Sequence, residues 1–383
     1  MVKYPEDWKS YTLGELGDVR MCKRIFASQT TKNGEIPFYK IGTFGGKADA
    51  FIPRALYEDY KNRFSFPKAG DTLLSAAGTI GRTVVYDGKD AYFQDSNIVW
   101  LEVSEEDIYK PFLKYFFESY PWVNLEGTTI SRLYNGLIRS TPIALPDISE
   151  QRSIAEALTS MDTHISNLTE LIEKKKAIRD GALEDLVSGR TRLEGQTISW
   201  VDTELGELAT YRKGNGLGTK DHYISTENIN QGFNGIRRYS TRDVVEGCAF
   251  YETDTLIANI RPYLRKVWYA EFSGICSLDV LALQPKPAID PKYLYYLVAN
   301  DRFINYVMNG GVKGIKMPRG DKKFMLKYSV RIPSDKAIQA ELAQMITSMD
   351  DEIASLEAER DKMRQIKAGM MDDLLTGRVR LIG

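Results

Sequence analysis

The chain has 383 residues, 51 Lys and Arg, 52 Asp and Glu, and 43% hydrophobic residues, an ordinary globular composition with room for two domains. Its apolar runs fall short of the roughly 18 to 20 residues of a membrane span, and its first residues, MVKYPEDWKS, lack a signal peptide's apolar stretch, so a cytoplasmic protein is expected. Three cysteines and two histidines, widely spaced in the sequence, argue against a zinc site or a disulfide framework.

Each half of the chain opens with the same short motif. WKSYTLGEL begins at Trp8 and WVDTELGEL begins at Trp200, with Trp and LGEL at the same internal spacing. We therefore predict two related globular segments, residues 1–147 and 196–333. Short β-rich runs such as TVVY, SNIVWLEV, KVWYA and CSLDVLALQP alternate in them with helical patterns such as PFLKYFFESY and PKYLYYLVANDRFINYV. This pattern is typical of a mixed α+β fold and not of regular βαβ alternation.

A loop with glycine or proline and basic residues is predicted at corresponding places in the two segments. SAAGTIGRTVVY follows Leu74 and ANIRPYLRKVWY follows Ile257, so a strand is expected to turn and return as a second strand. Such a loop brings backbone amides and an arginine close to an anion. An exposed hairpin turn is the simpler alternative. The candidate anion-contacting residues here are Gly78, Thr79, Gly81, Arg82, Asn259, Arg261, Arg265 and Lys266.

A second pair of loops precedes the last strand of each segment. GTTISRLYNG occupies 127–136 and GGVKGIKMPRGDKKFMLK occupies 310–327, and residues 197–333 carry 19 Lys and Arg against 14 Asp and Glu. Lysine and arginine interleaved with glycine suit a surface that follows phosphates, whereas a solvated loop is the alternative. The candidates are Ser131, Arg132, Lys313, Lys316 and Arg319, with Tyr39, Phe44, Tyr211, Tyr223 and Tyr263 as nearby aromatic residues.

Two long helices are predicted, at 148–195 and 334–383. Each carries an apolar stripe, which in the first comprises Ile154, Leu158, Met161, Ile165, Leu168 and Ile172. The second stripe lies 188 residues further on, so the helices are expected to pack as a parallel or antiparallel coiled-coil pair. At about 40 residues each would be about 60 Å long. Ordinary core helices are the alternative. The expected caps are Ser149 and Ser334 or Asp335 at the N-termini, and Gly189 and Gly377 at the C-termini.

An enzyme finds little support in the sequence. Two histidines give a poor basis for a nucleophile system, and one of them, His164, lies on a predicted long helix. Asn259 to Pro262 partly matches the Asn-Pro-Pro-aromatic loop of amino-methyltransferases but lacks the second proline and the aromatic residue. A glycine loop for S-adenosylmethionine is also missing. We therefore assign no catalytic, metal or cofactor-binding residues.

The combined pattern resembles the specificity (HsdS) subunit of type I restriction-modification systems over essentially the whole chain. The resemblance rests on the two Trp and LGEL motifs, on ALPDISEQRSIAEALTSMD and on the repeated S-M-D…L-x-x-G-R-x-R-L helices. One departure is RIPSDKAIQAELAQMITSMD, which has one more residue after Pro333 and lacks the pair Glu150-Gln151, so the start of the second helix is less well defined.

The resemblance implies two target-recognition domains, each reading one half of a split DNA sequence. It also implies that the helices space these domains and dock two methyltransferase (modification) subunits, on which S-adenosylmethionine is expected. Restriction (translocase) subunits are a further partner of the family. Most of the basic candidates would then contact phosphates and a minority would read bases, with arginine to guanine and asparagine to adenine as usual pairings. The alternative is a stand-alone DNA-binding or interaction scaffold without a modification partner.

Overall fold

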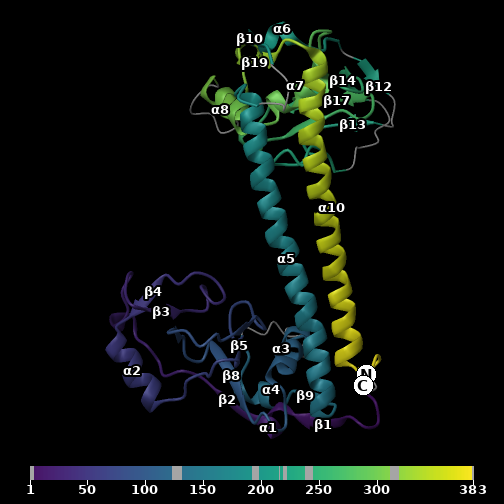
Figure 1. Cartoon of the computed structure of the whole chain (residues 1–383). Helices are drawn as coiled ribbons and strands as arrows, with labels where there is room; N and C mark the ends of the chain where they lie inside the picture. The colour runs from purple at the N-terminus through teal and green to yellow at the C-terminus, as the bar shows by residue number, and fades with distance from the viewer. Residues whose placement is uncertain are drawn as a thin grey trace. The chain divides into compact units, whose positions relative to one another are not determined.

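The computed structural model describes residues 4–122, 132–191, 198–214, 216–218, 222–237, 245–310 and 319–381. It divides into two compact units (Figure 1). Unit 1 comprises Met1–Leu168 and Glu359–Gly383, and unit 2 comprises Thr169–Ala358. Each unit thus combines one globular segment with parts of both long helices. Over the described residues, no helix is apolar along enough of its length to cross a membrane.

Unit 1 is built around a four-stranded antiparallel sheet in the order β2-β8-β5-β6. The strands are β2 (Gly17–Arg20), β5 (Thr72–Ser75), β6 (Thr83–Val85) and β8 (Ile98–Val103). A smaller sheet contains β3 (Ile36–Tyr39), β4 (Ala50–Ile52) and β7 (Tyr92–Phe93), and a ribbon joins β1 (Lys9–Thr12) to β9 (Pro142–Leu145). The helices are α1 (Leu13–Leu16), α2 (Arg54–Arg63), α3 (Lys110–Ser119) and α4 (Asn135–Arg139).

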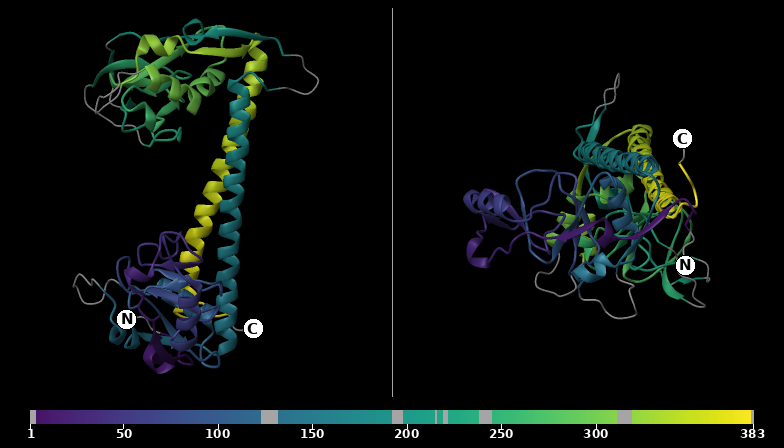
Figure 2. Two further views of the ribbon diagram at one scale, coloured as in Figure 1. Left: turned by 90° about the vertical axis from the view of Figure 1, so that its left-hand side faces the viewer. Right: turned by 90° about the horizontal axis from the view of Figure 1, so that it is seen from below.

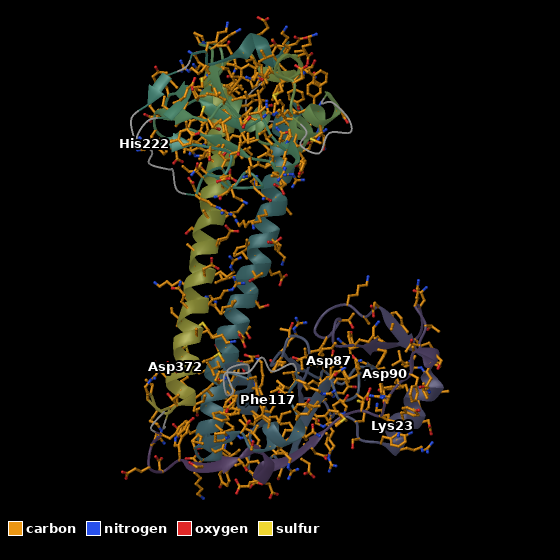
Figure 3. All side chains as sticks on the ribbon, turned by 180° about the vertical axis from the view of Figure 1, so that it is seen from behind. Lys23, Asp87, Asp90, Phe117, His222 and Asp372 are labelled. Atoms are coloured by element: carbon orange, nitrogen blue, oxygen red, sulfur yellow. The ribbon has the colours of Figure 1, made fainter. Side chains whose placement is uncertain are left out.

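Two apolar clusters fill unit 1. One packs α3 against the helix that follows β9 and includes Phe117, Leu158 and Leu374. The other lies between the small sheet and α2 and includes Tyr57 and Tyr92. Figure 3 shows Phe117 on the side of the unit that carries the long helices, whereas Asp90, which accepts a hydrogen bond from the Tyr57 hydroxyl, lies at the remote side.

Unit 2 repeats this plan with a four-stranded sheet in the order β11-β18-β15-β16. These strands are β11 (Ala209–Tyr211), β15 (Thr255–Ala258), β16 (Val267–Tyr269) and β18 (Val280–Pro285). A second sheet contains β12 (Gly216–Gly218), β13 (Tyr223–Ile224), β14 (Val245–Phe250) and β17 (Gly274–Cys276), and a ribbon pairs β10 (Trp200–Glu204) with β19 (Ser329–Pro333). The helices are α6 (Leu205–Leu208), α7 (Pro291–Val298), α8 (Asp301–Gly310) and α9 (Lys322–Leu326). The predicted α+β class is confirmed, and the larger sheets of the two units have matching strand orders.

Two runs that the sequence presents as continuous are interrupted. CSLDVLALQP is a strand, a turn at 277–279 and a second strand. The run from Pro291 breaks between α7 and α8 at Asn300, whose side chain accepts from the Phe303 amide and donates to the carbonyls of Tyr296 and Leu297. A short polar side chain that satisfies backbone groups locally competes with helix continuation, which explains the break.

The long helices are α5 (Ile148–Val187) and α10 (Lys336–Leu375), each of 40 residues. Asp147 accepts from the Glu150 amide, and Asp335 accepts from the Ala337 amide. These aspartates are therefore the N-caps, as predicted for Asp335, whereas Ser149 lies inside the helix and Ser334 precedes the cap. The aspartate lies two residues before Ser149 in α5 and one residue after Ser334 in α10, and in both helices its side chain accepts from free amides of the first turn in place of the serine. Gly189 and Gly377 follow the C-termini at φ values of +68° and +70°, as predicted.

Segments of α5 and α10 lie side by side in each unit and run antiparallel (Figures 1 and 2). In unit 1, Asp162 pairs with Lys367, and His164 lies 3.8 Å from Glu359. In unit 2, the Lys175 ammonium lies 2.8 Å from Glu352. The partner number falls as the α5 number rises, which decides between the parallel and antiparallel alternatives. Each globular core also takes residues from both helices, among them Leu183, Leu186, Leu342 and Ile346 in unit 2.

Candidate nucleic-acid interface

The two predicted loops are hairpin loops of the same design, one in each unit. The first hairpin loop, residues 76–82, joins β5 to β6, and the second hairpin loop, residues 259–266, joins β15 to β16. A backbone hydrogen bond closes each loop, from the amide of the residue before the loop to the carbonyl of the last loop residue. Ser75 N donates to Arg82 O at 2.8 Å, and Ala258 N donates to Lys266 O at 2.9 Å. The expectation of a strand, a loop and a returning strand is confirmed in both units.

Both hairpin loops take a left-handed backbone conformation at two matching positions. In the first, these positions are Gly78 (φ +65°) and Gly81 (φ +85°), and in the second they are Arg261 (φ +54°) and Arg265 (φ +56°). Glycine adopts this conformation freely, whereas a residue with a Cβ atom pays about 1 to 2 kcal/mol. The first loop shows that glycine is sufficient at both positions of this turn. The second loop has arginine at both, although arginine is less favourable there.

An arginine from further along the chain bridges each hairpin loop. Arg132 forms an antiparallel β-bridge with Ala77, and Arg319 forms the same bridge with Ile260. The Arg132 guanidinium donates to the Ser96 carbonyl at 2.7 Å, and the Arg319 guanidinium lies 3.0 Å from an Asp279 carboxylate oxygen. Two predicted residues that are far from the loops in sequence are thus brought to the same place in both units.

The last residue of each hairpin loop ties the loop to a neighbouring segment. The Arg82 guanidinium donates to the Phe44 carbonyl at 2.8 Å, and the Lys266 ammonium donates to the Thr226 carbonyl at 2.5 Å. Burial lowers the pKa of Lys266, and the charge of Arg237 lowers it further. The Phe44 side chain is buried, so its ring is not exposed to a ligand.

The two left-handed arginines differ in their contacts. The Arg265 guanidinium lies 2.7 Å from the Asp301 carboxylate, and its carbonyl accepts from the Phe233 amide. Arg261 is exposed, and its side chain makes no hydrogen bond or ion pair with any residue in the described part of the chain. Tyr263, between them, is half exposed.

The remaining predicted residues divide into shaping positions and positions outside the described residues. The Thr79 carbonyl accepts from the Ser75 hydroxyl, which closes the first loop internally. Asn259 is buried, and its backbone binds Asp279 and Gly320. Ser131, Lys313 and Lys316 lie outside the described residues.

Sequence reasoning missed the turns that support the loops. Ser96 and Asp279 receive the bridging arginines, and the amides of Gly232 and Phe233 donate to Leu264 and Arg265. An acidic residue within an apolar run, as at Asp279, is the signal that could have indicated a partner for a nearby arginine.

Comparison with known proteins places this geometry in context. The family model for the type I restriction modification DNA specificity domain matches residues 5–177 and again residues 198–365. A type I restriction enzyme specificity subunit of Haemophilus influenzae is 48% identical over 162 residues, a stretch that is 42% of each chain. The EcoDI specificity subunit of Escherichia coli is 23% identical and aligns over 86% of this chain and 79% of its own length.

A solved structure shares the fold. The crystal structure of the S subunit of a type I restriction-modification system from M. genitalium matches with a TM-score of 0.62 at 18% identity, covering 98% of this chain and 97% of that one.

Proposed function

Because the chain belongs to the DNA specificity subunits of type I restriction-modification systems, we propose that each unit reads one half of a bipartite target in duplex DNA. The target-recognition domains in this proposal are residues 1–147 and 196–333. The spacer helices are residues 148–195 and 334–383. The complex would then recognise a long target, because one chain carries two domains that each read a short sequence.

The observation that carries the proposal is the repeated loop arrangement. Each unit has a hairpin loop with two left-handed positions and a bridging arginine, but the side chains on these scaffolds differ. Gly78 and Gly81 stand where the second unit has Arg261 and Arg265. A shared backbone with different side chains suits two readers of different half-sites, because base edges are distinguished by side-chain donors and acceptors.

The two long helices support a target with two separate half-sites. Each has 40 residues, or about 60 Å at 1.5 Å per residue. Two half-sites face the same side of duplex DNA when they lie about one helical turn apart, roughly 34 to 36 Å. Two readers joined by helices of this length therefore suit a gapped sequence better than one contiguous sequence.

The repeat also supports docking of two identical methyltransferase subunits, one for each half. The same tyrosine contact recurs on the two helices: Tyr115 binds Asp162 at 2.8 Å, and Tyr296 binds Asp350 at 2.9 Å. The tyrosines are buried, but the helix segments that carry these aspartates repeat 188 residues apart and would present related surfaces to the two subunits. In this proposal the chain is non-catalytic, and S-adenosylmethionine on the methyltransferase supplies the methyl group.

The experiment that tests the proposal maps methylated adenines in the host genome with and without this gene. We expect deletion to abolish methylation at one split motif, which would also define both half-sequences and their spacing. Purification of the tagged chain should recover the methyltransferase in a two-to-one ratio. A methylome that does not change, with no methyltransferase recovered, would favour a stand-alone DNA-binding scaffold.

A further inference from the structure

The basic residues around the second hairpin loop are almost all bound within unit 2. Arg265 is paired with Asp301, Lys266 with the Thr226 carbonyl and Arg319 with Asp279. Among these described residues Arg261 is the exception, because its exposed guanidinium has no partner in the described part of the chain. A guanidinium with five unused donors is available to a ligand.

The backbone under Arg261 is held on several sides. Pro262 is buried, and the Ile260 bridge to Arg319 fixes the residue before Arg261. After it, Gly232 N donates to Leu264 O at 3.1 Å, and Phe233 N donates to Arg265 O at 2.9 Å. Arg261 is therefore a free side chain on a rigid platform.

The left-handed conformation makes the presence of arginine at this position informative. The matching position in the first hairpin loop is Gly78, so the turn itself does not require a side chain. Strained residues that persist at such positions cluster at functional sites. The left-handed backbone at Arg261 thus points to a role for its side chain.

We propose that Arg261 reads a guanine in the half-site of unit 2, with its guanidinium fork directed at the O6 and N7 acceptors. This inference rests on the proposed function, since it assigns one base-reading residue within that interface. A contact with phosphate alone does not need a rigid platform, because phosphates accept hydrogen bonds from many directions and carry no sequence information. Bidentate readout of guanine does need one, because both donors must be placed together.

The test uses the complex of this chain with its methyltransferase subunits. The wild-type complex first methylates a plasmid, and the modified motif is mapped. Duplexes carrying this motif, and duplexes with each guanine of the unit 2 half replaced, then serve as binding probes at several salt concentrations. The variants are Arg261→Gly and Arg261→Lys, with Arg331→Ala as a control because Arg331 is an exposed arginine on β19, away from the loop.

Arg261→Gly should keep or raise the melting temperature, because glycine accepts the left-handed backbone. It should also reduce discrimination at one guanine by about ten- to a hundredfold, the range for one bidentate contact. Arg261→Lys should keep the salt dependence but lose most of the discrimination, because lysine keeps the charge without the fork. The control should bind and discriminate like the wild type.

The proposal would be overturned if Arg261→Gly lost the same affinity for the motif and for every altered duplex. If the slope of log K against log salt concentration also fell by about one, Arg261 would be a phosphate contact. Unchanged discrimination in Arg261→Gly would overturn it as well. Failure of the underlying function looks different, because the wild-type complex itself would then methylate no split motif.

Discussion

Gln151 and Gln339, which lie 188 residues apart, make the same hydrogen bonds in the two units. Gln151 accepts from the Tyr109 amide at 2.9 Å and donates to the Pro146 carbonyl at 3.1 Å. Gln339 accepts from the Asp290 amide at 2.8 Å and donates to the Pro333 carbonyl at 2.9 Å. The second helix therefore begins in the same way as the first, although the Glu-Gln pair is absent from its sequence.

Replacing Gln339 with leucine should lower the free energy of unfolding by about 2 to 3 kcal/mol, because it leaves a backbone amide and a carbonyl without their partner. Gln151→Leu should have a similar effect, since both side chains are buried. Urea unfolding of the purified variants measures this. Gln344→Leu, at an exposed position on α10, is the matched control and should change stability by less than about 0.5 kcal/mol. Equal stability of all three variants would contradict the prediction.

Arg380 joins the C-terminal end of the chain to the buried carboxylate of Glu150. Its Nε atom lies 2.6 Å from Glu150, and its Nη2 atom lies 2.8 Å from Asp7. Arg380→Met should destabilise the protein more than the loss of a surface ion pair would, because Glu150 is 2% exposed and would lose its cation. Thermal and urea unfolding measure the change.

Arg378→Met is the control for Arg380, because Arg378 makes its ion pairs with exposed carboxylates on the same stretch. Arg378→Met should lower stability far less than Arg380→Met, because exposed ion pairs contribute little. The double variant Glu150→Gln with Arg380→Met should recover part of the loss, since no charge is then left buried. If Arg380→Met proved as mild as Arg378→Met, the buried pair would have no structural role.

Asp162 and Asp350 occupy matching positions on the two long helices, but their pKa values shift in opposite directions. Burial raises the pKa of Asp162, but hydrogen bonds from Lys367, Lys114 and Tyr115 outweigh it and lower the pKa overall. Burial raises the pKa of Asp350, and Arg179 and Tyr296 only partly offset it. The Asp162 contribution is thus present above the ordinary carboxyl pKa and is lost as the pH falls through the folded value. The Asp350 contribution is present at low pH and is lost as the pH rises through its folded value.

At pH 7, Asp162→Asn should therefore lower stability by up to about 1 kcal/mol, the range for partly exposed ion pairs, whereas Asp350→Asn should be neutral or stabilising. Lowering the pH to about 4 should narrow the difference in stability between the two variants through Asp350, which then protonates, and lowering it further should remove the Asp162 contribution as well. Unfolding curves over this pH range measure both effects. Equal losses in both variants at neutral pH would contradict the assignment.

Arg265 and Asp301 should act as one unit in DNA binding. Their ion pair holds the second hairpin loop in place. We therefore expect Arg265→Ala and Asp301→Ala each to weaken binding to the target motif about tenfold, or about 1.4 kcal/mol. The double variant should lose no more than either single variant. Titration of labelled duplex with the complex measures the three affinities. A loss in Arg265→Ala alone would instead show a direct contact between Arg265 and DNA, and unchanged affinity in both would remove this pair from the interface.

Local patterns in the sequence were sufficient to predict the repeat, the α+β class and the two long helices. The apolar stripes, the closing glycines and the strand-loop-strand runs each involve neighbouring residues, so their effect on structure is readable without the fold. The N-cap prediction at Ser149 was wrong and the choice between Ser334 and Asp335 stayed open, because serine and aspartate compete for the same amides and only geometry decides between them.

The tertiary structure alone decided which candidate arginines are engaged and which one is free. Arg132 meets Ser96, and Arg319 meets Asp279, across separations of 36 and 40 residues that no local pattern reports. The antiparallel order of α5 and α10 and the contact of Arg380 with Glu150 likewise depend on segments that meet only after folding. Local sequence determines backbone preference and burial, but the partner of a charged side chain is determined by what the folded chain brings within reach, and so the freedom of Arg261 could not be seen before the fold.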